Sequence, residues 1–315
     1  MVSYLIKRLG QLAIVLVMGS LAVWLMIYAI PGGPELAIVG ADATQAQIDA
    51  VRVRLGLNEP LPLQYLSWAG NVLTGDLGNS LASNKPVTEL LGQRIPATFQ
   101  LIFLSAIIGL AIALPIGVLA AWRPRSLTAH AATVYQVVLL AFPSFWLGII
   151  LIWLFGLQWR LLPTVSSYVP FTSDPIGAFR NTLLPALTLG LFMAAVLIRF
   201  VRSAVLEELS KPYVRAIRAK GASEASILVN HALRNAALPI ITIVGLQLGA
   251  FIGGAVVTES VFNYPGIGRL VLVAVNSRDY PLVQGVLMFV VLSFAFINMA
   301  VDLLYAAFDP RIKTQ

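Results

Sequence analysis

One short basic stretch holds the residues of this 315-residue chain best suited to specific chemistry. It runs Tyr213-Val-Arg-Ala-Ile-Arg-Ala-Lys-Gly-Ala-Ser-Glu224, and its small, aromatic and charged members are Tyr213, Arg215, Ala216, Arg218, Ala219, Lys220, Gly221, Ala222 and Glu224. Small residues let a partner approach the backbone closely, while the basic residues can pair with acids on that partner. The pattern predicts a short helix, a break at Gly221 and a second helix from Ser223 to Asn235. Its chemistry is therefore that of docking.

The residue sets needed for catalysis or metal binding are missing from the sequence. There is no cysteine, and the two histidines, His130 and His231, are far apart without ligand spacing. No phosphate-binding G-x-x-x-x-G-K-[ST] loop occurs, and no apolar segment carries paired Asp, His–Glu or Ser–His sets. We therefore expect no catalytic residue, no metal site, no cofactor and no ATP site on this chain.

The elements that position the docking stretch must lie in a membrane. The chain is 58% hydrophobic and only 11% charged, against about 25% charged residues in a soluble domain. Six segments approach the roughly 20 apolar residues that cross a bilayer. They are Leu9–Ile30, Thr98–Ala121, Thr133–Gly156, Leu183–Arg199, Ala236–Thr258 and Gln284–Val301. We expect an all-α integral membrane protein of about six spans, the short fourth span extending toward Leu206 as a helix.

The distribution of Lys and Arg predicts the orientation. With the N-terminus inside, inner segments hold thirteen of these residues and outer segments eight, which favours N-in and C-in. The net charge of +7 therefore reflects topology, and we expect no nucleic acid partner. The apolar run Leu9–Ile30 is longer than the ~7–15 apolar residues of a signal peptide, and no small-x-small cleavage site follows it, so we interpret Val2–Ile30 as a retained first helix.

Two hydrophilic segments are too long to be turns. Pro31–Ala97 is predicted outside, with a helix at Thr44–Leu55 that opens on a capping-box spacing and a second helix at Leu61–Thr74. Val201–Asn235 is predicted inside and contains the docking stretch. The expected organisation is a first helix at 1–30, an extracytoplasmic segment at 31–97, and a five-helix core at 98–315 with a cytoplasmic loop at about 201–235.

The docking stretch resembles the coupling loop, or EAA loop, of permeases in binding-protein-dependent ABC importers. Arg215 stands at the usual Glu position and Ile217 at the second Ala position when the loop is aligned on Gly221. These departures are similar to the dipeptide and oligopeptide (and nickel) branch, whose form resembles Y-V-R-x-A-R-A-K-G…H-A-L-R-N-A. The matching letters here are Tyr213-Val-Arg, Ala219-Lys-Gly221 and His231-Ala-Leu-Arg-Asn-Ala236.

Shorter matches to the same family run in order along the chain. They are Leu55-Gly-Leu57, Gly75-Asp-Leu-Gly78, Glu259-Ser-Val-Phe262, Tyr264-Pro-Gly-Ile-Gly-Arg269, Arg278-Asp-Tyr-Pro281 and Asp309-Pro-Arg-Ile312. Together with the long segment after the first helix, they resemble the first, B-type permease subunit of such importers.

The resemblance implies a type I ABC importer permease with a small extracytoplasmic subdomain after its first helix, in a bacterial inner (cytoplasmic) membrane. It implies a heterodimer with a second homologous permease, two cytoplasmic ABC ATPase subunits or domains that bind ATP and Mg, and an extracytoplasmic substrate-binding protein. The loop around Gly221 would fit a groove of the ATPase. Candidates for the outer gate or the binding-protein surface are Asp76, Glu259, Tyr264, Arg269, Arg278 and Asp279.

Several alternatives remain open on sequence alone. The substrate of a permease in this branch is a di- or oligopeptide, a nickel chelate, glutathione or haem. A self-contained channel or secondary carrier is a different class, although no span has a charge at its centre, which argues against an ion-driven carrier. Gly245, Gly249 and Gly253 recur on one face of the fifth span, where they either pack helices tightly or line the pathway.

Overall fold

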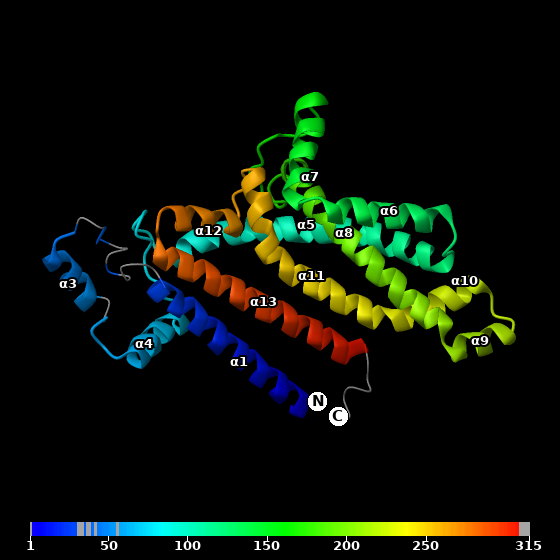
Figure 1. Cartoon of the computed structure of the whole chain (residues 1–315), viewed down its shortest axis with the longest axis horizontal. Coiled ribbons are helices and arrows are strands. Elements are labelled where there is room, and N and C mark those ends of the chain that lie inside the picture. The colour runs from blue at the N-terminus through cyan, green and yellow to red at the C-terminus, as the bar shows by residue number, and fades with distance from the viewer. Residues whose placement is uncertain (1, 30–34, 36–38, 41–42, 55–56, 309–315) are drawn as a thin grey trace. The chain divides into compact units, whose positions relative to one another are not determined.

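The computed structural model describes the whole chain except residues 1, 30–34, 36–38, 41–42, 55–56 and 309–315. The matches at Leu55-Gly56 and Asp309–Ile312, and the basic residues Arg311 and Lys313, lie outside the described residues. Figure 1 shows a helical protein, and the only pairing of extended backbone in its described part is one bridge between Asn79 and Pro86. The helices are α1 (Val2–Leu25), η1 (Met26–Ala29), α3 (Gln45–Arg54), α4 (Leu61–Leu73), α5 (Val87–Trp122), α6 (Leu127–Ala141), α7 (Ser144–Leu151), η2 (Ile152–Gln158), α8 (Pro175–Ser210), α9 (Pro212–Ala219), α10 (Glu224–Ser226), η3 (Ile227–Ala232), α11 (Leu233–Val261), α12 (Ile267–Asn276) and α13 (Tyr280–Phe308).

Five described helices are long and apolar enough to cross a membrane, and a sixth span results if one bent pair crosses as a unit. The five are Arg8–Tyr28, Val87–Trp122, Pro175–Ser210, Glu224–Val261 and Tyr280–Leu303. The prediction of about six spans is confirmed. The fourth predicted span is much longer than its apolar centre, because α8 continues from Pro175 to Ser210 in one helix of 36 residues.

The third predicted span is not one straight helix. Residues predicted as Thr133–Gly156 fall on α6 and on α7 with η2, and these two parts are bent by 100°. Phe142 between them is extended (φ −103°, ψ 148°), as the residue before a proline tends to be, and Pro143 begins the next helix. Figure 1 shows α7 turning away from α6 at this point. The span predicted at Thr133–Gly156 is therefore a bent pair of helices and not one straight helix.

The chain divides into two compact units. The first contains residues 1–96 and 266–296, and so holds α1, α3, α4 and α12. Its core forms where the start of α5, α12 and the start of α13 meet. The buried members of that core are Val87, Leu91, Ile267, Ala274, Leu282, Val283 and Val286.

The second unit contains residues 97–265 and 297–315 and is organised around α8. Glycines let α5 approach α8 closely: a Cβ at Gly190 would lie 2.8 Å from the carbonyl oxygen of Ser105, and one at Gly117 would lie 2.7 Å from Val201. The cytoplasmic loop predicted from the sequence belongs to this unit, so α8 and α11 are the elements that position it.

Candidate functional site

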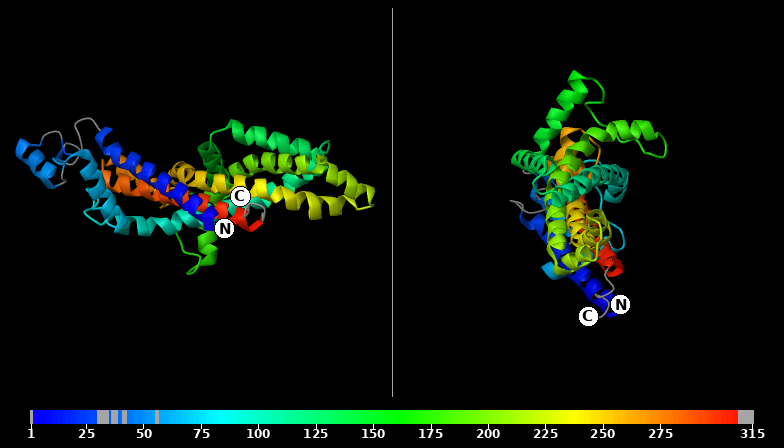
Figure 2. Two further views of the ribbon diagram at one scale, coloured as in Figure 1. Left: turned by 90° about the horizontal axis from the view of Figure 1, so that it is seen from below. Right: turned by 90° about the vertical axis from the view of Figure 1, so that its right-hand side faces the viewer.

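The predicted docking stretch forms a compact turn between the ends of α8 and α11. Lys211 is extended (φ −66°, ψ 149°) and separates α8 from α9, which starts at Pro212. Pro suits the first helical position because the missing N–H would have no helical acceptor there. Figure 2 (left) shows α9 and the following turn at the far end of α8 and α11. The short helix predicted before Gly221 is confirmed.

Gly221 ends α9 in the left-handed conformation, with φ +86°. The amide of Gly221 donates to the carbonyl of Arg218 at 3.0 Å, and the amide of Ala222 donates to that of Ile217 at 3.4 Å. These two bonds are those of a Schellman motif, which satisfies the last carbonyls of a helix and favours glycine at its left-handed position. The sequence break at Gly221 is therefore a defined turn.

A bidentate ion pair closes this turn. Arg218 donates from Nε to Glu224 Oε1 at 2.5 Å and from its terminal nitrogen to Oε2 at 3.0 Å. Both side chains are exposed, and the hydrogen bond and charge of Glu224 raise the pKa of Arg218. The pair joins the two sides of Gly221. The side chains of Arg215 and Lys220 are exposed at the same tip.

The surface of α9 matches a docking role in its pattern of exposure. The exposed residues of this helix and its C-cap are Arg215, Ala216, Ala219 and Lys220. Val214 is fully buried and packs against the rest of the chain. The second helix predicted from Ser223 to Asn235 does not stand alone. It starts at α10, passes through the π-helical turns of η3 and continues without a break into α11, so the turn is joined directly to a membrane span.

A polar network that the sequence analysis missed ties the turn to both spans. Glu208 near the end of α8 accepts a hydrogen bond from the hydroxyl of Tyr213 at 2.9 Å and pairs with Lys211. Asn235 at the start of α11 donates to the same hydroxyl at 3.1 Å. The bond from Lys211 to Glu208 raises the pKa of Lys211. Tyr213 thus links α8, α9 and α11 through one oxygen atom.

Burial beneath the turn makes this link stiff. Val201 and Val205 of α8, Leu228 of η3 and Ala236 of α11 share a hydrophobic cluster with Ala121 of α5. Packed interiors resist small displacements, because few voids exist to absorb them. The turn therefore rests on a packed cluster that α5, α8, η3 and α11 share.

Of the predicted outer residues, Asp279 has an interior role. It is fully buried and accepts hydrogen bonds from Ser80 Oγ at 2.5 Å, from the amide of Leu81 at 3.1 Å and from that of Ala82 at 3.3 Å. It also caps α13 by accepting from the amide of Leu282 at 3.3 Å. Its carboxylate is committed to holding a loop and a helix start, so it does not reach the surface of this chain.

Glu259 and Tyr264 are also fully buried. The hydroxyl of Thr98 donates to Glu259 Oε1 at 2.7 Å, which links α5 to the end of α11. Burial raises the pKa of Tyr264 to about 12, an effect that Glu259 and Tyr168 reinforce and Thr182 opposes. The three buried residues cannot contact an external protein without leaving the interior.

The other three predicted outer residues are accessible. Asp76 and Arg278 are exposed, and Arg269 is half-buried. Asp76 accepts from the amide of Gly78 at 2.9 Å, and Arg278 has a left-handed backbone with φ +54°. Their role in binding an external protein stays a prediction.

The three glycines of the fifth span do not share one environment. Gly245 is buried, and a Cβ there would lie 2.1 Å from Val301 Cγ2 on α13. Gly249 is buried as well, whereas Gly253 is exposed and no described atom lies within 4 Å of a Cβ built on it. The first position packs two helices of this chain, and the third faces away from it.

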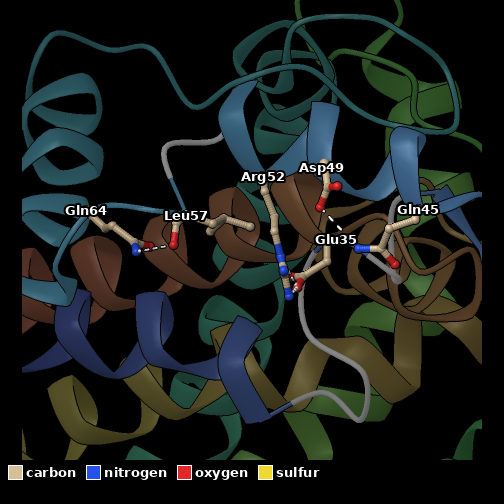
Figure 3. A network of polar contacts seen from close by, with 6 residues as sticks. All are labelled: Glu35, Gln45, Asp49, Arg52, Leu57 and Gln64. Atoms are coloured by element: carbon tan, nitrogen blue, oxygen red, sulfur yellow. Dashed lines mark hydrogen bonds and ion pairs between the residues drawn. The ribbon is translucent and has the colours of Figure 1, made fainter.

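The segment predicted to be extracytoplasmic contains both predicted helices, α3 and α4. Gln47 donates its amide to the carbonyl of Thr44 at 3.0 Å, and its side chain accepts from the amide of Thr44 at 2.9 Å, as one half of a capping box does. Figure 3 shows Arg52 of α3 pointing at Glu35, with 2.6 Å between the closest nitrogen and oxygen.

No group of three or more His, Asp or Glu that could hold a metal ion occurs among the described residues.

Comparison with known proteins gives the family. The sequence model described as "binding-protein-dependent transport system inner membrane component" matches residues 113–314, and that of the N-terminal part of such membrane components matches residues 1–102.

Individual relatives align along nearly the whole chain. A probable peptide ABC transporter permease protein, y4tP, from Sinorhizobium fredii is 40% identical over 310 residues, covering 98% of this chain and 99% of the relative. The glutathione transport system permease protein GsiC of Escherichia coli (strain K12) is 38% identical over 314 residues, covering 99% of each. Among solved structures, the inward-facing MetNI methionine ABC transporter matches with a TM-score of 0.56 at 19% identity, over 70% of this chain and 96% of that chain.

Proposed function

The chain belongs to the family of binding-protein-dependent transport system inner membrane components, and on that premise we propose that it supplies half of a translocation pathway and couples it to cytoplasmic ATPases through the turn at Gly221. It is a multi-pass membrane permease subunit of an ABC importer. The observation that carries the coupling proposal is the hydroxyl of Tyr213, which joins the exposed helix α9 to Glu208 of α8 and Asn235 of α11.

The chain has no phosphate-binding loop of its own, and its turn at Gly221 exposes basic and small residues to a partner. We propose a heterodimer with a second homologous permease, two ATPase subunits or domains that bind ATP and Mg, and an external substrate-binding protein. The exposed side chains of Arg215 and Lys220 would meet acidic groups of the ATPase, and Ala216 and Ala219 would allow close approach. The excess of Lys and Arg in the inner segments supports N-in and C-in termini, with the turn on the cytoplasmic side.

The proposed cycle is alternating access. Closure of the ATPase dimer on ATP moves α9, and the rigid link through Tyr213 carries that motion into α8 and α11. The spans then reorient around a central pathway. This scheme requires two discrete arrangements of the spans, which ATP and the binding protein favour differently.

We propose a peptide as the substrate class. Relatives named for peptide and for glutathione transport are 40% and 38% identical to this chain, and glutathione is itself a small peptide. Glutathione is therefore the second candidate substrate. The measurement that decides between them is the binding of a peptide library and of glutathione to the partner binding protein, with nickel chelates and haem as further ligands.

The coupling proposal is tested by enlarging the small residues of α9. Ala216→Phe and Ala219→Phe add bulk at exposed positions, so the chain itself has no reason to unfold. We expect purified importer carrying either change to lose substrate-stimulated ATP hydrolysis and import while its apparent melting temperature is unchanged. Ala46→Phe, an exposed alanine on α3, is the matched control and should retain both activities.

Gly221 offers a second test with its own control. A bulky side chain there adds backbone strain at φ +86° as well as volume. Asn tolerates left-handed backbone, so Gly221→Asn tests the turn and Gly221→Trp tests the docking volume. We expect only Gly221→Trp to separate ATP hydrolysis from import, and normal coupling in all the α9 and Gly221 variants would refute the assignment.

A further inference from the structure

Helix α4 has a composition unlike that of a helix in a water-exposed cap. It carries no charged side chain between Leu61 and Leu73, and charges first occur at Glu59 before it and Asp76 after it. Leu63, Leu66 and Leu73 are exposed by 52%, 62% and 88%. Their spacing places them, with Gly70, on one face of the helix. An exposed leucine face of this kind needs an apolar environment.

The opposite face of α4 packs on the first membrane span. Tyr65 and Ser20 share a hydrogen bond between their hydroxyls at 2.8 Å, and the ring centroids of Tyr65 and Trp24 are 5.7 Å apart. The hydroxyl of Tyr28 donates to the side chain of Gln64. Ser20, Trp24 and Tyr28 follow one another at four-residue spacing, so α4 lies along the last two turns of that span. Figure 1 shows α4 beside α1.

These contacts fix the depth of α4 relative to the span. The candidate span runs from Arg8 to Tyr28, and Ser20 lies eight residues before its end. At 1.5 Å per residue, the Ser20–Tyr65 bond is about 12 Å inside the end of the span. The hydrocarbon core is about 30 Å thick, so this bond lies below the headgroups.

Exposed charged residues flank α4 on both sides, Glu59 before it and Asp76 after it. Gln64 also donates to the carbonyls of Glu59 at 2.7 Å and Leu57 at 3.2 Å, which holds the entering loop against the helix, as Figure 3 shows for Leu57. After α4 the backbone turns at Gly75 with φ +84°. An apolar helix of 10–14 residues bounded by such turns fits a re-entrant or interfacial segment.

We propose that α4 is embedded in the bilayer leaflet opposite the N-terminus, with Leu63, Leu66 and Leu73 in contact with lipid acyl chains. The rings of Trp24 and Tyr65 pack against each other between α4 and α1 and hold α4 against the span. The occupant of the leucine face is lipid, because α4 runs beside a span whose own exposed side chains, such as Met18 and Leu25, are apolar. Part of the predicted extracytoplasmic segment then belongs to the membrane.

The depth of single labelled cysteines tests this proposal. The chain has no native cysteine, so Leu66→Cys and Leu73→Cys each give one labelling site. The variants are spin-labelled in the complete importer, with partner cysteines replaced, in phospholipid vesicles. Collision rates are measured with oxygen, which concentrates in lipid, and with a water-soluble nickel chelate. We expect high oxygen and low nickel collision rates, matching an Ile14→Cys control on exposed α1.

A Gln45→Cys control on exposed α3 should give the opposite ratio. Leucine-face labels that collide with nickel as often as Gln45→Cys would place α4 in water and overturn the proposal. Low collision rates with both reagents would overturn it too, because they mean that a protein covers the face. The measurement needs no transport activity, so its outcome is independent of whether the Gly221 turn couples to an ATPase.

Discussion

The side-chain amide of Asn235, at the start of α11, donates a hydrogen bond of 3.1 Å to the hydroxyl of Tyr213 on α9. The same hydroxyl donates to Glu208 at 2.9 Å, so one atom is shared by elements that leave and enter the membrane. Burial raises the pKa of Tyr213, Asn235 opposes that shift, and Glu208 adds to it. The hydroxyl therefore stays protonated at neutral pH and keeps donating to Glu208.

Removing this hydroxyl should weaken coupling more than stability. In Tyr213→Phe the ring still packs, but both hydrogen bonds are lost, at a cost of about 1 kcal/mol. If the bonds form in only one of the two proposed arrangements of the spans, that is roughly a five-fold change in the equilibrium between them. We expect more ATP hydrolysed per substrate imported, measured in proteoliposomes. Tyr135→Phe, which removes a bond to the carbonyl of Leu191 far from the turn, should leave this ratio unchanged.

Exchanging the charges of Arg218 and Glu224 separates an internal role from a docking role. The double variant Arg218→Glu with Glu224→Arg can rebuild the ion pair across Gly221, but it presents the charges to a partner in reverse order. Both side chains are exposed, so we expect no loss of stability. Co-purification of the ATPase should fall and become less sensitive to salt. If the double variant co-purifies with as much ATPase as the wild type does, the Arg218–Glu224 pair has a purely internal role.

Local signals explain what the sequence predicted well. Helix α4, the start of α3 and the stop at Gly221 each follow from residues adjacent in the chain, whose capping and left-handed preferences act within one turn. Apolar length predicted the spans for the same reason. The effect of each proline on its helix could not be predicted from neighbouring residues alone. Pro115 and Pro185 lie inside continuous helices, whereas Pro143 precedes α7 at the break after α6, and the outcome depends on whether neighbouring helices satisfy the freed carbonyls.

The site was predicted in its exposed part and missed in its supporting part. The basic and small residues of α9 form a sequence pattern, but Glu208 and Asn235 meet Tyr213 only because two spans return to the same place. Asp279 was predicted on the outer surface because it is charged, and that prediction was wrong. Nothing in its sequence neighbourhood indicates that Ser80, almost two hundred positions earlier, donates to it.

Asp279 should therefore behave as a structural residue. Asp279→Ala removes the cap of α13 and leaves buried donors near Ser80 and Leu81 without an acceptor, at a cost of about 3 kcal/mol. Asp279→Asn keeps one acceptor oxygen and should cost about 1 kcal/mol. The measurement is the apparent melting temperature of the importer in detergent, with exposed Asp76→Ala as a mild control. Weaker affinity for the binding protein at unchanged stability would contradict this role.

The ion pair between Glu35 and Arg52 should make the segment before α4 sensitive to acid. Burial alone would raise the pKa of Glu35, but its backbone hydrogen bond and Arg52 together lower it below 4.5. A lowered folded-state pKa contributes stability that is present above pH 4.5 and is lost as the pH falls through the folded-state value. The effect is small, because Arg52 is largely exposed. The protection factors of the α3 amides, corrected for the intrinsic pH dependence of hydrogen exchange, should fall at low pH in the wild type and less so in Arg52→Gln.

The glycines of α11 give the sharpest contrast between packing within the chain and contact beyond it. Gly245→Ala places a methyl group against Val301 and should cost about 1–3 kcal/mol, since an overfilled helix contact must shift. Val301→Ala in the same chain should recover most of that loss, because it removes the atoms that the new methyl meets.

Gly253→Ala meets no described atom, so it should leave the stability of the isolated chain unchanged or raise it slightly. If Gly253 faces the second permease, this variant should still impair assembly or import. Melting temperature of the isolated subunit and yield of the assembled importer are the two measurements, and equal destabilisation by Gly245→Ala and Gly253→Ala would show that the two positions are packed alike.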